Sequence, residues 1–198
     1  MSRTKFLLAF LSFVFVILGG QAQAALIDFD PLNNAHGSSY TGHAQDGHTV
    51  TATGGNWSEG HNVGYGKPVP AIFGSFRNNQ GGGEVVVTGG LFRFISVEVM
   101  SLFTSGARLD VTGKLGGVTQ YGYSFNIPTT NVFEKLVHPF QFDVLIDELY
   151  LAWSPGDNQA GLAMDNILLR SEEVPAPAAL GLMLMGLAGL VALRRRKS

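Results

Sequence analysis

The chain has 198 residues, enough for one domain with targeting segments, and its lack of cysteine excludes disulfide bonds and thiol chemistry. Residues 25–173 carry seven Lys and Arg against fifteen Asp and Glu, a net charge of −8, which argues against nucleic acid as a partner because such binding depends on neutralising phosphates. Only 14% of the residues are charged and 26 are glycine, a composition typical of short strands joined by tight turns.

The first 24 residues have the organisation of a signal peptide. Arg3 and Lys5 form a basic start, an apolar run follows from Phe6 to Leu18, and Ala22-Gln23-Ala24 supplies a small-x-small cleavage site. We therefore expect signal peptidase to cut before Ala25, and the rest of the chain to be exported across the inner membrane. The alternative is an uncleaved N-terminal anchor, which the short apolar run disfavours.

Residues 25–173 are expected to fold as an all-β domain. Short runs that alternate apolar and polar residues, or that are rich in β-branched residues, are separated by glycine and proline. The strand candidates are 26–30, 49–52, 71–76, 84–88, 91–100, 107–115, 118–125, 140–145, 149–153 and 162–169. Gly89-Gly90 predicts a tight hairpin. No stretch has helical periodicity, so we predict an antiparallel β-sandwich of the jelly-roll type.

The first and last predicted strands carry acidic residues. Ile27-Asp28-Phe29-Asp30 opens the domain, and Ala163-Met164-Asp165-Asn166-Ile167 closes it. Both segments resemble the corresponding strands of carbohydrate-binding-like jelly rolls. In similar jelly rolls a Ca²⁺ between these strands has a structural part, so the resemblance implies Asp28, Asp30 and Asp165 as oxygen ligands. The alternative for Asp165 is a carboxylate that accepts backbone N–H bonds at a turn.

Aromatic side chains offer a second kind of site, because they could stack on sugar rings. The candidates in the domain are Trp57, Tyr65, Tyr121, Tyr123 and Trp153. Trp57 and Tyr65 lie in glycine-rich segments, which makes them the candidates for a ligand site on the surface. For an aromatic residue of a β-sandwich the alternative is a place in the core.

Four histidines, His36, His43, His48 and His61, lie in one polar stretch near Asp46 and could bind a metal ion. They lack the close spacing of a ligand set, apart from His43 and His48, so we expect solvated loop histidines. No nucleophile elbow, His-Glu-x-x-His motif or recognisable glycosidase carboxylate pair is present. We therefore expect no enzymatic activity and no cofactor, and a hydrolase is the least favoured alternative.

The last 25 residues have three parts: Val174-Pro175-Ala176-Pro177, an apolar run at 178–193, and the cations Arg194, Arg195, Arg196 and Lys197. The two prolines favour an extended tether. The apolar run would make a helix of about 24 Å, just short of the hydrocarbon core of a bilayer. The cations favour a cytoplasmic C-terminus.

This order resembles the PEP-CTERM sorting segment that ends secreted proteins of Gram-negative bacteria, although Ala176 stands where that family usually has Glu. The resemblance implies an exosortase, a membrane-embedded transpeptidase-like enzyme, as partner, and cleavage near residues 174–177. The alternative is an ordinary single-pass anchor. β-Sandwich domains often stand upstream of such segments.

The sequence therefore predicts an exported, non-enzymatic protein of the cell surface or the exopolysaccharide matrix. It would pass through a single-pass membrane intermediate. The alternative function is that of a carbohydrate-binding module with a polysaccharide as partner.

Overall fold

The computed structural model describes residues 23–61, 70–75, 82–102, 106–128, 132–138, 144–155 and 161–172. These residues form strands and loops, and all except Glu172 belong to one compact unit, Gln23–Ser171. The expected all-β, antiparallel fold is confirmed. Residues 1–22 and the sorting segment at 174–198 lie outside the described residues. None of the segments that the structure describes is a helix long and apolar enough to cross a membrane.

Eleven strands occur in the described part of the chain, and every pairing given below is antiparallel. They are β1 (Gln23–Ile27), β2 (Gly42–Gln45), β3 (His48–Gly54), β4 (Trp57–Gly60), β5 (Ala71–Ser75), β6 (Gly83–Leu102), β7 (Ala107–Leu115), β8 (Val118–Ile127), β9 (Glu134–Val137), β10 (Ile146–Pro155) and β11 (Gly161–Glu172). Ala24 and Ala25, at the predicted cleavage site, lie in β1 and pair with Arg170 and Leu169 of β11. Ala22 lies outside the described residues.

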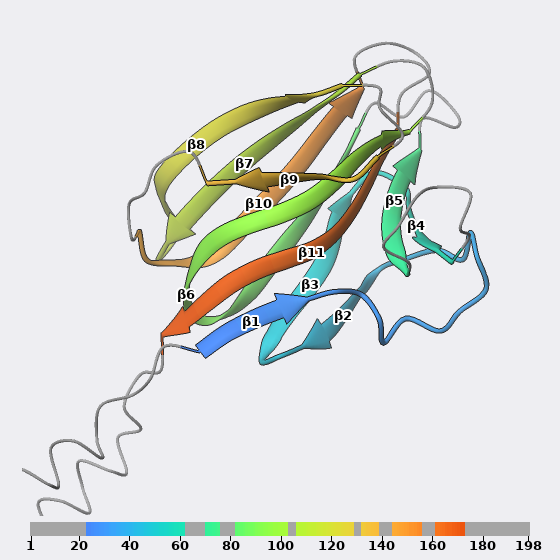
Figure 1. The fold of residues 1–198 in the computed structure, drawn as a ribbon. Coiled ribbons are helices and arrows are strands. Elements are labelled where there is room, and N and C mark those ends of the chain that lie inside the picture. Colours follow the sequence, from blue (N-terminus) through green and yellow to red (C-terminus); the bar gives the residue numbers. More distant parts are fainter. Residues whose placement is uncertain are drawn as a thin grey trace, which may run out of the picture. The chain divides into compact units, whose positions relative to one another are not determined.

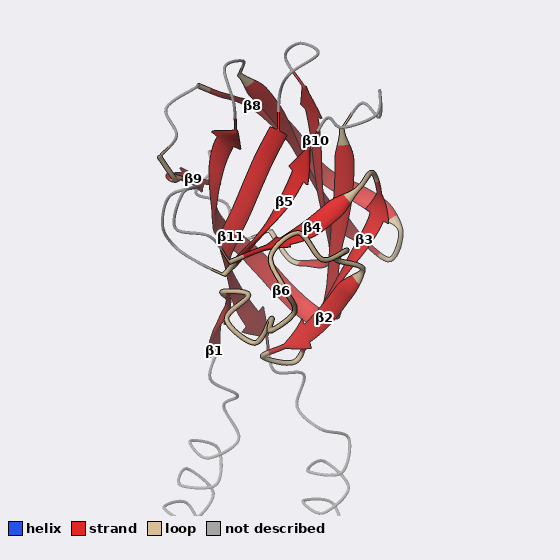
Figure 2. Ribbon diagram, turned by 90° about the vertical axis from the view of Figure 1, so that its right-hand side faces the viewer, coloured by secondary structure: helices blue, strands red, loops and turns tan. Residues whose placement is uncertain are grey.

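The long strand β6 joins two sheets (Figure 1). Its first half pairs with β3 on one side and β10 on the other, and its second half pairs with β9 and neighbours β11. The first sheet therefore has the order β2-β3-β6-β10-β7-β8. In the second sheet β11 connects β6 to β1, β5 and β4, and β11, β5 and β4 lie side by side in Figure 2.

Gly89 and Gly90 lie inside β6, so the predicted hairpin is wrong. Thr88 pairs with Glu148 and Phe92 pairs with Ile146, which leaves β6 two residues longer than β10 between these pairs. The glycines have φ values of 131° and 66°, and a Cβ at residue 89 would lie 2.5 Å from the carbonyl oxygen of Gly47. They therefore form a bulge, which bends the strand where it passes between the sheets.

The core lies between the two sheets and takes alternate residues from their strands. Its members include Val85, Val87, Leu109, Val111, Leu149, Leu151, Leu162, Met164, Ile167 and Leu169. In β11 the step from Met164 to Ile167 breaks the alternation, and Asn166, which lies between them, has a positive φ of 47°. Each fully buried aliphatic side chain contributes about 1.5–3 kcal/mol to the stability of this core.

Candidate functional site

Trp57, predicted to lie on the surface, is part of the core. It begins β4, is 2% exposed, and donates its indole N–H to the carbonyl oxygen of Gly54 over 3.1 Å. A Cβ at Gly83 would lie 2.9 Å from both Trp57 Nε1 and Trp153 Nε1, so a glycine leaves room for both indoles. The prediction of Trp57 as a surface ligand residue is therefore wrong. Tyr65, the other candidate, lies outside the described residues.

The aromatic side chains of β8 point toward the interior of the sandwich. Tyr121 and Tyr123 pair with Gly113 and Val111 of β7, on the face that also carries Leu109 and Val111. Their rings stack with centroids 5.8 Å apart, and the ring of His138 lies edge-on to both. Burial raises the pKa of both tyrosines. These residues follow the alternative of a core position, since both rings pack against the core and are only partly exposed.

Asp165 is a carboxyl group of β11 with no exposed surface. Its Oδ1 accepts the backbone N–H of Asn166 over 2.7 Å, and its Oδ2 has no hydrogen-bond partner. Burial raises the pKa of Asp165 to about 8, an effect to which the charges of Glu98, Asp28 and Asp30 add. The carboxyl group is therefore mostly protonated at neutral pH.

The predicted calcium ligands do not form a ligand set. Asp28 Oδ1 already accepts hydrogen bonds from Gln45 Nε2 at 2.6 Å and from the backbone N–H of Asp30 at 3.1 Å. Within the described ranges, no three His, Asp or Glu side chains are arranged to hold a metal ion. Asp28, Asp30 and Asp165 therefore do not fit Ca²⁺ in this arrangement. Asp165 instead accepts the backbone N–H of Asn166, as in the alternative.

Within the described residues the histidines are not grouped around a common centre; His48 is buried and His43 is half-buried. His48 is buried in β3, with Nε2 2.9 Å from Ser171 Oγ, and burial lowers its pKa. His43 Nδ1 lies 2.9 Å from the hydroxyl of Tyr40, and burial lowers the pKa of His43 as well. The expectation of solvated loop histidines is thus wrong for His48 and incomplete for His43.

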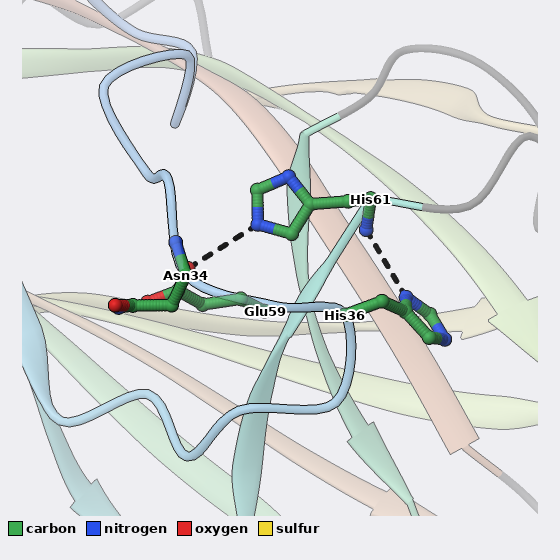
Figure 3. Close-up of polar contacts among 4 residues, drawn as sticks. All are labelled: Asn34, His36, Glu59 and His61. Atoms are coloured by element: carbon green, nitrogen blue, oxygen red, sulfur yellow. Dashed lines mark hydrogen bonds and ion pairs between the residues drawn. The ribbon is translucent and has the colours of Figure 1, made fainter.

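A buried carboxylate that the sequence did not reveal lies at Glu59 in β4 (Figure 3). Asn34 donates from Nδ2 to Oε1 at 2.6 Å and from its backbone N–H to Oε2 at 3.2 Å, and His61 Nε2 lies 3.2 Å from Oε2. Burial would raise the pKa of Glu59, but these hydrogen bonds outweigh it and hold the pKa below its usual value. The His61 backbone N–H donates to His36 Nδ1.

The Glu59 cluster holds a loop in place. The Glu59 backbone accepts from the N–H of Gly37 and donates to the carbonyl oxygen of Ser38, so that residues 34–38 are bound to β4 through both side chain and main chain. Both carboxylate oxygens are occupied by groups of the protein. The cluster therefore anchors the loop, and neither carboxylate oxygen of Glu59 is left free to contact a substrate.

The outside of the first sheet carries a row of residues that spans all six of its strands. In cross-strand register these are Gly42, Thr51, Val86, Tyr150, Thr112 and Gly122. Their neighbours along the strands, such as Leu149 and Leu151, point into the core, so the row faces outward. With strands about 4.8 Å apart, the row is about 24 Å long.

Two further rows flank this one. One contains Thr49, Thr88, Glu148 and Lys114, and the other contains Glu84, Ala152, Asp110 and Ser124. We call the three rows together the outer face. Apart from Val86, Ala152 and the ring of Tyr150, its side chains are small or can form hydrogen bonds.

Tyr150 is the aromatic residue of the outer face, and it lies in the middle of the sheet. Its hydroxyl donates to Glu148 Oε2 over 2.9 Å, and Lys114 Nζ lies 3.9 Å from the ring centroid. The neighbouring Arg108 and Asp110 form an ion pair at 2.9 Å. The face thus offers one fixed ring surrounded by carboxylates, hydroxyls and cations. The alternation Leu149-Tyr150-Leu151 indicates that Tyr150 and the two leucines lie on opposite faces of the sheet, but not which face is covered.

No family model matches the chain, and no curated protein matches it in sequence. Among solved structures, it is similar to a DUF4465 family protein from Bacteroides caccae, with a TM-score of 0.51 and 10% identity over 76% of this chain and all of the other. It is also similar to a mutant of the family 29 carbohydrate-binding module CBM29-2 complexed with mannohexaose, with a TM-score of 0.46 and 14% identity over 76% of this chain and 92% of that one. At 10% identity, the likeness to the DUF4465 family protein shows the fold alone.

Proposed function

We propose that this chain is a non-catalytic, jelly-roll-like carbohydrate-binding domain, and that it holds a polysaccharide on the outer face. The observation that carries this proposal is the placement of Tyr150, a half-buried ring in a row that also holds two glycines, two threonines and the buried Val86. A sugar ring has an apolar C–H face, which stacks on an aromatic ring, and a rim of hydroxyls, which need polar partners. Both kinds of contact are available here within one row.

The length and charge of the outer face suit an extended glycan chain. A row of about 24 Å, running across the strands, gives room for several sugar rings in succession. Glu84, Glu148 and Asp110 accept hydrogen bonds from sugar hydroxyls, while Arg108 and Lys114 donate them. The support for glycan binding comes from these residues, because the carbohydrate-binding modules named above are similar to this chain only in fold.

Lys114 covers part of the surface on which a sugar would stack. A cation–π contact at an exposed site is worth about 0.5–1 kcal/mol, so a ligand displaces the ammonium group at little cost. Once displaced, Lys114 Nζ becomes a donor for the hydroxyls of the same sugar. The resting contact between Lys114 and Tyr150 therefore keeps the ring covered without closing the site.

The test is affinity electrophoresis of the protein through gels that contain a panel of neutral and acidic polysaccharides. Tyr150→Ala should weaken retardation by about tenfold, which corresponds to about 1.4 kcal/mol. Tyr150→Phe keeps the stacking ring and should retain most of the binding. The matched control is Val137→Ala, an exposed residue of β9 in the second sheet. Glycan binding by the outer face is refuted if Tyr150→Ala and Val137→Ala migrate alike, or if no polysaccharide retards the wild-type protein.

We propose further that residues 174–198 act as a PEP-CTERM-like sorting segment, which delivers the exported domain to the cell surface. The supporting observation is the order of the Pro-x-Pro tether, the apolar run and the cations at 194–197. Replacing Pro175 and Pro177 together by Ala should block maturation and leave a membrane-bound precursor. Ala176→Glu, which restores the usual residue of the family, should mature at least as fast as wild type. If the double variant matures normally in the native host, the segment is a plain anchor.

A further inference from the structure

β8 is a long free edge in the part of the chain that the structure describes. It ends the first sheet and pairs with β7, and no other described strand pairs with its free side. The ten residues from Val118 to Ile127 include no charged residue, no histidine and no proline. Native proteins usually keep free edges short, charged or covered, because the unpaired N–H and C=O groups of an edge recruit further strands. Apart from a bulge at Gln120, where the pairing with β7 slips between Thr119 and Tyr121, β8 has none of these features within the described residues.

The other edges in the described part of the chain do have them. Residues 37–40 form hydrogen bonds along the free side of β4. The N–H of Leu26 in β1 donates to the carboxylate of Asp46. β2 and β9 have only four residues each, and β9 carries Glu134 and Lys135. The lack of protection at β8 is therefore specific to this edge.

The inner side of β8 carries aromatic surface that a further strand would cover. Tyr121, Tyr123 and Phe125 point inward at every second position, yet all three remain partly exposed. They lie on the last strand of their sheet, so their outer flanks have no described strand beside them. Aromatic side chains bring a large apolar surface, and a cross-strand aromatic neighbour stabilises a sheet by about 0.2–1 kcal/mol.

The outer side of β8 allows two identical edges to approach each other. Its outward residues are Thr119, Gly122, Ser124 and Asn126, and Gln120 lies exposed at the bulge; all five are neutral. The charged residues opposite β8 are on β7: Arg108 and Asp110 are paired with each other and contact Ser124, and Lys114 lies over the ring of Tyr150. Two copies placed edge to edge therefore bring no like charges together, which is the usual obstacle to such pairing.

We propose that β8 pairs in antiparallel fashion with β8 of a second copy of this chain. Antiparallel pairing of a strand with itself has two-fold symmetry, so one edge is sufficient and the assembly closes as a dimer. The first sheets of the two copies become one continuous sheet, and their outer faces continue across the new strand pair. This dimer does not depend on whether the outer face binds a glycan.

The test uses the intact chain, which has no cysteine, so that one introduced thiol reports on one position. Gly122 lies near the middle of β8, and a Cβ there would meet no atom closer than 3.8 Å, so Gly122→Cys should fold. The matched control is Thr51→Cys, an exposed residue of the same row on β3, away from the edge. Purified chains are treated with a short bismaleimide. Gly122→Cys should give a cross-linked dimer, and Thr51→Cys should not.

A second variant tests the pairing by charge. Gln120→Lys and Asn126→Lys, added to Gly122→Cys, place like charges across the strand pair and should reduce the cross-linked fraction at least tenfold. Gln120→Ser and Asn126→Ser in the same background should leave it unchanged. If Gly122→Cys does not fold, as judged by circular dichroism, Gln120→Cys replaces it. Equal cross-linking at residues 122 and 51, or a dimer that the lysines do not affect, overturns the proposal.

Discussion

Replacing Asp165 by Asn should change how the stability of the domain depends on pH. Asp165 is fully buried, and its Oδ2 has no hydrogen-bond partner. Its pKa is raised from 3.8 to about 8 in the folded chain, mainly by burial. The folded chain therefore keeps a proton that the unfolded chain releases near pH 4. Since the folded state binds more protons, raising the pH between these two values favours unfolding.

The size of the effect follows from the two pKa values. Each pH unit in this interval costs about 1.4 kcal/mol of unfolding free energy, and the cost levels off near the folded-state pKa. Between pH 5 and pH 9 the loss amounts to about 4 kcal/mol, and about two-thirds of it occurs below pH 7. That is a large share of the roughly 5–15 kcal/mol by which domains are stable.

The assay is equilibrium unfolding of residues 25–173 in denaturant at several pH values from 5 to 9, with EDTA present. Asp165→Asn cannot ionise, and it keeps an oxygen that can accept the N–H of Asn166. It should lose about 4 kcal/mol less than the wild type over this range. Asp110→Asn, on the exposed outer face, is the control and should follow the wild-type slope. Parallel slopes for wild type and Asp165→Asn would refute the reasoning.

Four further predictions can be checked on the same protein. Trp57→Ala should lower the unfolding free energy by about 3–5 kcal/mol, measured in denaturant, because the indole is buried and bonded to Gly54. Gly74→Ala would place a Cβ against the indole Nε1 of Trp153 and should lower the unfolding free energy by about 1–3 kcal/mol. Gly122→Ala, whose Cβ would have no atom closer than 3.8 Å, should leave the melting temperature nearly unchanged. Burial lowers the pKa of His48, so the unfolded chain binds a proton that the folded chain does not, and the domain should become less stable as the pH falls below about 6.5. In thermal melts from pH 5 to 7, His48→Gln should reduce this loss of stability at acidic pH. Residues 25–173, expressed alone, should be soluble and give a β-type circular dichroism spectrum, and a helical spectrum would contradict the fold.

The longer strands could be predicted from the sequence because their alternation covers many residues. The predicted strand at 107–115 has the same bounds as β7, and those at 118–125, 149–153 and 162–169 lie within β8, β10 and β11. The four-residue strands β2, β4 and β9 were not predicted, since so few residues carry no clear period. They are extended because each forms backbone hydrogen bonds with a neighbouring strand.

Gly89 and Gly90 show where a local signal has two structural outcomes. Two consecutive glycines allow positive φ, which suits a hairpin turn and a bulge equally well. The choice depends on which strands lie beside the segment. β3 and β10 flank β6 before the glycines, and β9 and β11 flank it after them, so the strand bends and continues.

The sequence by itself determined the all-β class, the alternation within the long strands and the acidic charge of the domain. The tertiary structure alone decided which side chains are available to a ligand. Alternation shows that Leu149 and Tyr150 face opposite ways, but it does not show which of the two faces the second sheet covers. Trp57 is buried because residues distant in sequence, such as Gly83 and Trp153, pack around it, whereas Tyr150 remains half-exposed because no described strand lies over its face of the sheet. Burial is a property of non-local packing, so a glycine-rich neighbourhood and an aromatic residue type could not determine it.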